Sequence, residues 1–151
     1  MRTALDSNIL SALWSNEPHA ERIARRLGVA KQQGAVLVSP VAYVELFAYP
    51  RATEEFIQRF LSDNGVMVDF HLAAPTWAEA GRRFASYAHR RRKAGGGEAR
   101  RLAADFVVGA HALLQAERLM TLDVGRFRRD FPELILFPVE TGLVEGSLSG
   151  S

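Results

Sequence analysis

Four acidic residues stand in apolar surroundings, where an ordinary surface carboxylate is not expected. Glu45 and Asp105 have apolar neighbours on both sides along the chain, and Asp6 and Asp123 each follow a short apolar segment. Burying a lone carboxylate costs free energy unless its charge is compensated or its pKa rises. Carboxylate oxygens are also the ligands that Mg²⁺ and Mn²⁺ prefer. If the four side chains meet, they fit metal-assisted cleavage of phosphodiester bonds.

Two of these acids are predicted at the carboxyl ends of strands. Leu5 ends a short first strand in this interpretation, and the apolar run Leu119–Leu122 forms a later one. In open α/β sheets, ligands bind in the crevice at the carboxyl ends of the strands. Acids that meet there from distant parts of the chain would repel one another unless a cation joined them. We therefore predict one metal site built from the four acids.

Taken one at a time, each acid also fits a structural role. Asp6 can be the N-cap of a helix, and Asp105 can cap a helix that begins near Phe106. Glu45 can be a buried acid paired with an arginine, and Asp123 can be a plain turn residue. For each acid considered alone, a structural role and a role as metal ligand therefore remain alternatives.

The basic residues are concentrated in one block. Residues 82–101 hold eight Lys and Arg against one acid, whereas the whole chain has a net charge of +2. Seventeen of the nineteen basic residues are arginine, which can bind phosphate through two parallel hydrogen bonds. The block is either a nucleic-acid-binding surface or a solvated helix end with a bias towards arginine. Its members are Arg82, Arg83, Arg90, Arg91, Arg92, Lys93, Arg100 and Arg101.

Short apolar segments alternate with helical patterns along the chain, which predicts an α/β domain in three layers. Its central sheet is expected to be mostly parallel, with helices on both faces. We expect this domain to cover residues 1–140, followed by a flexible tail at 141–151. Predicted strands end at Leu5 or cover 35–38, 66–68, 119–122 and 134–137. Predicted helices follow Asp6 or cover 19–33, 41–49, 53–61, 75 into the basic block, 101–116 and 124–129.

The composition excludes several classes of protein. The chain has no cysteine, which rules out disulfides, thiolate zinc sites and thiol nucleophiles. No apolar run approaches the roughly 18 residues that span a membrane, and residues 1–6 lack the apolar core of a signal peptide. We therefore expect a cytoplasmic protein with no membrane partner.

Trp14 and Trp77 fall at apolar helical positions and are expected in the core.

Other catalytic motifs are absent from the sequence. The four histidines do not have the spacing of a zinc site. Gly95–Gly97 follows a basic helix rather than a strand, so it is not a phosphate-binding loop. Asn8 stands where a haloacid-type phosphatase would have its second aspartate. The four acids are therefore the strongest candidates for chemistry.

The order and context of these acids resemble the PIN-domain nucleases. Leu5–Leu10 resembles the family's opening motif, an acid followed by a small hydroxyl residue and asparagine. Val44–Leu46 resembles the internal glutamate helix, and Asp105–Leu113 resembles the helix of the third acid. Leu119–Phe127 resembles the closing motif. The resemblance covers roughly residues 1–139, and the chain looks most like the VapC-type toxins of toxin–antitoxin pairs.

This resemblance implies a magnesium- or manganese-dependent endoribonuclease with a PIN-like fold. Ser7 and Thr121 match hydroxyl positions near the family's site, and Asn8 matches a residue that supports the first acid. The family's metal-ligand and catalytic positions match Asp6, Glu45, Asp105 and Asp123.

A VapC-like toxin further implies a cognate antitoxin, typically a small DNA-binding protein. The predicted helix 41–49 is apolar on all sides, and Phe56, Ile57, Phe60 and Leu61 follow it. Some of this surface is expected to remain exposed for another chain. We also expect the chain to form a homodimer. A homodimer contact and simple core packing are the alternative uses of this apolar surface. Two other functions stay open: a nucleic-acid-binding module that uses the basic block, and an inactive scaffold of the same fold.

Overall fold

The computed structural model of the protein describes residues 1–15, 18–96 and 101–139. Within these residues, every neighbouring pair of strands in the sheet is parallel, which confirms the predicted α/β architecture. The tail predicted at 141–151 and Arg100 of the basic block lie outside the described residues. The strands are β1 (Thr3–Leu5), β2 (Val36–Val38), β3 (Val66–Val68), β4 (Arg118–Met120) and β5 (Ile135–Leu136).

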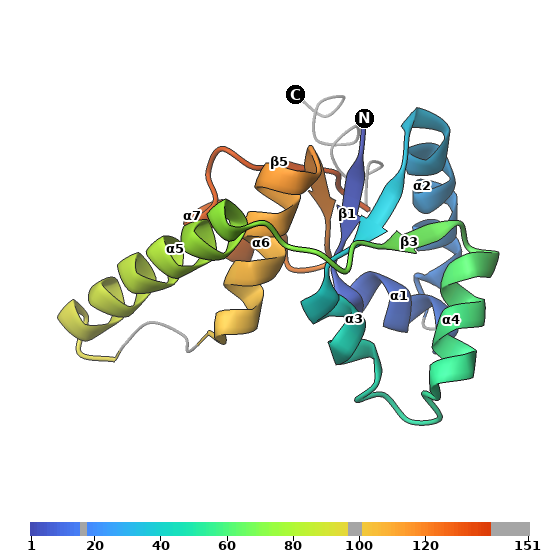
Figure 1. The fold of residues 1–151 in the computed structure, drawn as a ribbon, viewed down its shortest axis with the longest axis horizontal. Helices are drawn as coiled ribbons and strands as arrows, with labels where there is room; N and C mark the ends of the chain where they lie inside the picture. The colour runs from blue at the N-terminus through green and yellow to red at the C-terminus, as the bar shows by residue number, and fades with distance from the viewer. Residues whose placement is uncertain (16–17, 97–100, 140–151) are drawn as a thin grey trace.

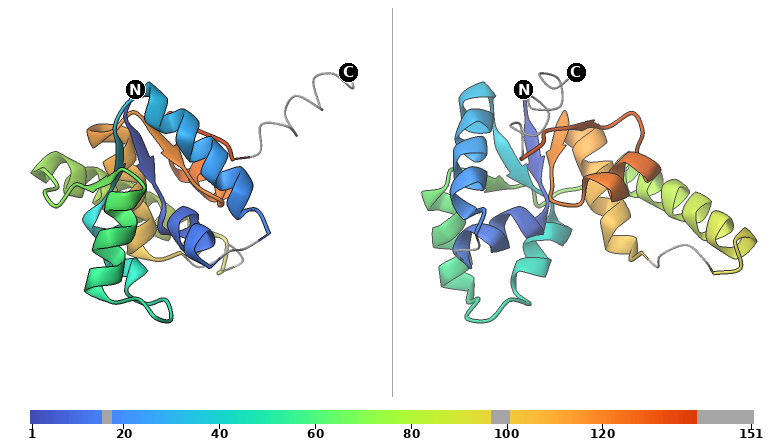
Figure 2. Two further views of the ribbon diagram at one scale, coloured as in Figure 1. Left: turned by 90° about the vertical axis from the view of Figure 1, so that its right-hand side faces the viewer. Right: turned by 180° about the vertical axis from the view of Figure 1, so that it is seen from behind.

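The strand order β3-β2-β1-β4-β5 explains why helices cover both faces of the sheet. The chain steps outward from β1 to β3 and then crosses back to β4, and right-handed crossovers in opposite directions place their helices on opposite faces. Figures 1 and 2 show α2 and α6 on opposite sides of the sheet. The helices are α1 (Ser7–Trp14), α2 (Ala20–Gln33), α3 (Pro40–Leu46), α4 (Glu54–Asp63), α5 (Ala74–Lys93), α6 (Ala103–Gln115) and α7 (Val124–Asp130).

The central strand β1 carries a polar residue that the sheet accommodates. Thr3 is fully buried, and its hydroxyl accepts a hydrogen bond from Nε of Arg118 on the neighbouring strand, at 2.8 Å. Leu5 aligns with Met120 of β4, and the backbone N–H of Asp6 donates to the carbonyl of Met120 at 3.0 Å. The ends of β1 and β4 are therefore fixed side by side, with Asp6 at that edge.

Several predicted helices have different ends in the structure, among them α3 and α6. The helix predicted at 41–49 covers Pro40–Leu46, and the Ser39 hydroxyl caps its start by accepting from the Ala42 N–H at 3.1 Å. The helix predicted from residue 101 begins at Ala103, and the backbone N–H of Arg101 donates instead to the Tyr87 hydroxyl. The segment predicted as strand 119–122 ends at Met120, which leaves the following residues free to turn.

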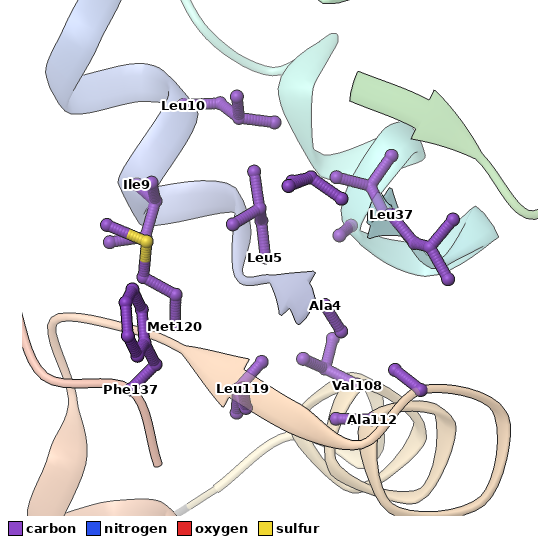
Figure 3. Packing of buried hydrophobic residues seen from close by; sticks show 14 of the residues in the cluster. Ala4, Leu5, Ile9, Leu10, Leu37, Val108, Ala112, Leu119, Met120 and Phe137 are labelled. Atoms are coloured by element: carbon purple, nitrogen blue, oxygen red, sulfur yellow. The ribbon is translucent and has the colours of Figure 1, made fainter. Parts of the chain in front are cut away.

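The core lies between the sheet and the helices on its two faces. Leu5 and Leu119 are almost completely buried, and Figure 3 shows them with Val108 and Ala112 of α6 nearby. Each fully buried side chain of this size contributes roughly 1.5–3 kcal/mol through the hydrophobic effect.

The long helix α5 packs along α6, and its carboxyl-terminal half extends away from the sheet (Figure 1). Its four last basic residues complement the negative end of the helix dipole.

Trp77 near the start of α5 was expected in the core, but its side chain is 51% exposed, with Nε1 donating to the carbonyl of Leu72. Trp14 does pack inward, against the rings of Phe56 and Phe60. Among the described helices, none is long and apolar enough to span a membrane.

Candidate active site

Asp6 lies directly after β1 and caps α1. Its Oδ1 accepts a hydrogen bond from the backbone N–H of Ser7 at 2.8 Å, so the N-cap role considered from the sequence is confirmed. Its Oδ2 accepts a hydrogen bond from the Thr121 hydroxyl, also at 2.8 Å. The Thr121 hydroxyl in turn accepts from the backbone N–H of Asp123 at 3.0 Å. One threonine therefore connects the segments that carry the first and the last of the four acids.

Asn8 makes a second connection between these segments. Its Nδ2 donates to Oδ2 of Asp123 at 3.3 Å, and its Oδ1 accepts from the backbone N–H of Leu122 at the same distance. The side chain of Asp123 is half exposed at the start of α7. The amide of Asn8 thus holds Asp123 at the edge of the sheet without burying it.

Glu45 faces the start of α1 from α3. The Ser7 side chain hydrogen-bonds to its carboxylate, and Ser7, Glu45, Ala48 and Tyr49 line a cavity of about 250 Å³. Partial burial raises the pKa of Glu45 to about 7, and the negative charges of Asp6 and Asp105 add to this effect.

Asp105 lies in the first turn of α6, two residues after the helix begins, so the idea that it caps a helix starting near Phe106 is wrong in detail. Its Oδ2 accepts from the backbone N–H of Leu102 at 3.4 Å. Two guanidinium groups also approach this oxygen: Nη1 of Arg126 at 3.5 Å and Nε of Arg101 at 3.9 Å. The carboxylate is therefore compensated by arginine.

The four acids come within electrostatic range of one another. The pKa of Asp6 is raised, mainly by burial and further by the charges of Asp105 and Asp123, while its hydrogen bonds from Thr121 and Ser7 oppose the rise. Since Glu45 responds to two of the same acids, four distant segments of the chain contribute to one negatively charged site.

The chemistry of this donor set fits a hard divalent cation. All of its charged atoms are carboxylate oxygens, and a cation among them would relieve the repulsion that raises the pKa of two of the acids. In the described ranges, the side chains as they stand do not form a group of three or more that encloses an ion. Metal binding here would thus include movement of side chains, among them the arginines that contact Asp105.

Two members of the basic block form close ion pairs within the fold. Arg83 contacts Glu133 at 2.5 Å and Glu79 at 3.5 Å, and Nη2 of Arg90 contacts Asp130 at 2.8 Å. These residues serve the fold, so a fully solvated helix face does not describe the block.

The other described members of the block face solvent or a cavity. The Arg82 side chain pairs with Glu79 but is 66% exposed, and Arg92 and Lys93 are exposed. Arg91, Arg92 and Arg101 line a cavity of about 710 Å³ between α5 and the start of α6. An anionic ligand could approach these guanidinium groups from solvent.

Sequence reasoning missed the ion pairs of two arginines beside the acids: Arg101, predicted only as a nucleic-acid-binding residue, and Arg126. Arg101 and Asp130 form a buried ion pair, with exposed side-chain fractions of 7% and 2%. Arg126 contacts both Asp105 and Asp123. Arg126 follows Asp123 by three residues, so the sequence could have indicated their contact. No local pattern indicates the pairing of Arg101 with Asp130, because these two residues meet only in the fold.

Comparison with known proteins places the chain in a family. The family model described as PIN domain matches residues 3–131. The fold is similar to that of VapBC2 from Rickettsia felis bound to a promoter DNA fragment, with TM-score 0.64, 18% identity, and 91% and 98% of the two chains covered. It is similar to VapBC-1 from nontypeable Haemophilus influenzae, with TM-score 0.63, 22% identity, and 92% and 98% covered.

A third similar structure is FitAB bound to the IR36 DNA fragment, with TM-score 0.60, 18% identity, and 91% and 94% of the two chains covered. At these identities, the solved structures show a shared fold. No curated protein matches the chain in sequence. The family model nevertheless covers both ends of the candidate site, from Asp6 to Asp123, and most of the chain. The chain belongs to the PIN domain family.

Proposed function

We propose that the chain is a divalent-metal-dependent endoribonuclease and the toxin of a toxin–antitoxin pair, acting in the cytoplasm. Residues 1–140 form its nuclease domain in this proposal. The observation that carries it is that carboxylates from four distant segments lie near enough to act on one another electrostatically, with the segments of Asp6 and Asp123 joined through Thr121 after β1 and β4. Such a cluster is unfavourable without a cation. Asp6, Glu45, Asp105 and Asp123 would hold Mg²⁺ or Mn²⁺.

The bound cation would lower the pKa of the attacking water and stabilise the leaving oxygen. The chain's own residues orient its ligands. Thr121 fixes Asp6, Asn8 fixes Asp123, and Ser7 contacts both Asp6 and Glu45. These hydrogen bonds leave the three carboxylates few orientations. Ligands that are restricted in this way favour a cation that demands a regular arrangement of its ligands.

The arginine-rich surface beside the acids supports a nucleic-acid substrate, and the resemblance to VapC-type toxins makes RNA the proposed one. Arg101 contacts Asp105 and also lines the cavity that Arg91 and Arg92 share. Phosphates that follow the scissile bond could bind along this surface, and such contacts would make RNA affinity fall as salt concentration rises. The engaged arginines 83 and 90 are expected to contribute mainly to stability.

The proposed activity is tested by incubating the purified protein with cellular RNA in Mg²⁺, Mn²⁺, Ca²⁺ or EDTA. We expect cleavage with Mg²⁺ and Mn²⁺, little with Ca²⁺, which takes more ligands at longer distances, and none with EDTA. A nucleic-acid-binding module, or an inactive scaffold, would leave the RNA intact in every condition. Binding that depends on salt without any cleavage would identify the module.

An antitoxin is the proposed protein partner, since the VapBC and FitAB structures of similar fold are complexes by their names. Part of the apolar surface expected from the sequence is exposed: Val44 by 65%, Phe47 by 41% and Phe56 by 42%. Ile57 and Leu61 are buried in the core instead. A small apolar segment of a second protein could cover the exposed group.

Co-expression tests this partner. The chain expressed alone should slow growth, and the small gene beside it in the genome should relieve the effect and yield a complex with suppressed cleavage. If the chain is harmless and forms only a homodimer through this surface, it is not a toxin. That result would leave the proposed nuclease activity unaffected.

A further inference from the structure

Arg126 lies between two of the four acids. Its Nη1 is 3.5 Å from Oδ2 of Asp105 and 3.9 Å from Oδ2 of Asp123. These carboxylates belong to α6 and to the residue before α7, so one guanidinium nitrogen links two elements. The Arg126 side chain is 42% exposed. It can therefore leave the acids for solvent without opening the core.

The four acids differ in how their charge is compensated. Asp105 and Asp123 both contact Arg126. Among the described residues, no arginine forms an ion pair with Asp6 or Glu45, and burial raises the pKa of both. Arg126 therefore compensates two of the four acids, and the other two have no arginine partner among the described residues.

We propose that Arg126 is a built-in counter-cation that holds Asp105 and Asp123 in the metal-free protein and competes with the divalent ion for them. This inference rests on the metal site of the proposed function. A divalent ion held by Asp105 would repel the guanidinium that contacts this carboxylate in the metal-free protein. Arg126 must then turn away when the ion binds.

Arg101 is not equivalent, although it also approaches Asp105. Its side chain is 7% exposed and is paired with Asp130, and Nη1 donates to the carbonyl of Arg126. These contacts fix it in place. Its charge therefore acts on the site in both the metal-free and the metal-bound protein, whereas the charge of Arg126 can move.

The test is the affinity for Mn²⁺, measured by isothermal titration calorimetry on wild type, Arg126→Gln and Arg128→Gln. Arg128 is exposed on the same helix and, in the described part of the chain, has no ion pair with the four acids. Removing a positive charge that contacts the ligands should tighten Mn²⁺ binding on the order of tenfold. Removing the charge of Arg128 should change the dissociation constant by less than about twofold, because water and salt screen it.

Thermal melts in EDTA give a second readout. Arg126→Gln should lower the melting temperature more than Arg128→Gln does, since it removes an ion-pair partner from both Asp105 and Asp123, and Mn²⁺ should then raise the melting temperature more. Equal Mn²⁺ affinity in both variants, or weaker binding by Arg126→Gln, overturns the inference while the metal site stands. If wild type and Arg126→Gln both fail to bind Mn²⁺, the metal site itself is wrong and the inference falls with it.

Discussion

The Thr121 hydroxyl donates a 2.8 Å hydrogen bond to Oδ2 of Asp6, and the two residues follow the neighbouring strands β4 and β1. They are 115 positions apart in the sequence. The bond favours the ionised form of Asp6 and opposes the rise in pKa that burial causes. Thr121 therefore keeps the first acid of the site available as a ligand.

Replacing Thr121 by valine should shift the activity of the protein to higher pH. The variant keeps the side-chain shape but loses a hydrogen bond worth about 1 kcal/mol that favours the ionised carboxylate, so the pKa of Asp6 should rise further. The acid limb of the pH–rate profile should move to higher pH with it. Thr121→Ser retains the donor and should leave the limb close to wild type. Identical profiles for the two variants would contradict this role.

Glu45 should make the metal-free protein less stable as the pH rises. Its pKa is about 7 in the fold against 4.5 for the ordinary side chain, so the folded state holds its proton more tightly than the unfolded state. The contribution is present below pH 4.5 and is lost as the pH rises towards 7. Allowing for partial exposure, we expect a loss of about 1–2 kcal/mol.

Urea unfolding in EDTA at pH 5 and pH 8 measures this change. Glu45→Gln carries no charge at either pH, so its free energy of unfolding should fall less over this interval than that of wild type. Saturating Mn²⁺ should remove the difference in wild type, because the cation favours the ionised carboxylate. An equal fall in wild type and variant would show that the raised pKa of Glu45 is wrong.

Arg92 should contribute to RNA binding through phosphate. It is exposed beside the cavity between α5 and α6. Arg92→Gln should weaken RNA binding and reduce the slope of log affinity against log salt by about 1. Arg25→Gln, on the exposed face of α2, is the control and should leave the slope unchanged. A slope that stays at the wild-type value in both variants would leave the basic block without a role in binding.

Gly109 should tolerate no larger residue, because α6 approaches Phe131 closely there. A Cβ at this position would lie 2.3 Å from the Phe131 ring, whose side chain is fully buried. Gly109→Ala should destabilise the protein by about 1–3 kcal/mol. Gly28→Ala, in a helix with nothing within 4 Å of the new Cβ, should stabilise it by about 0.5–1 kcal/mol. Melting temperatures that move in the same direction would refute this packing argument.

The alternation of apolar segments was sufficient to predict the fold. Parallel strands are short and continuous in apolar residues, as the buried strand 36–38 and the partly exposed edge strand 66–68 are, and helices between them have a different period. Exact helix ends were harder to predict. The position of Arg101 outside α6 depends on the Tyr87 hydroxyl, a contact made across 14 positions that no local pattern specifies.

The candidate site was predicted in part. Asp6 and Asp123 could be placed because strand ends meet at one edge of a parallel sheet. Thr121 was expected near the site only because it matches a hydroxyl position of the family. Its hydrogen bonds to Asp6 and to the backbone of Asp123 were not predicted. The arginine contacts of Asp105 were not predicted, since long side chains reach partners that depend on how α6 and α7 pack.

The central claim is that the carboxylates catalyse RNA cleavage with a bound divalent cation. Its most direct test is the cleavage rate of Asp105→Asn against Asp63→Asn in saturating Mn²⁺. Asp63 is exposed at the end of α4 and carries the same charge outside the site. We predict that Asp105→Asn lowers the rate at least about a hundredfold, as expected for loss of a group that acts in the transition state, while Asp63→Asn cleaves at the wild-type rate. Equal cleavage by the two folded variants would contradict the claim.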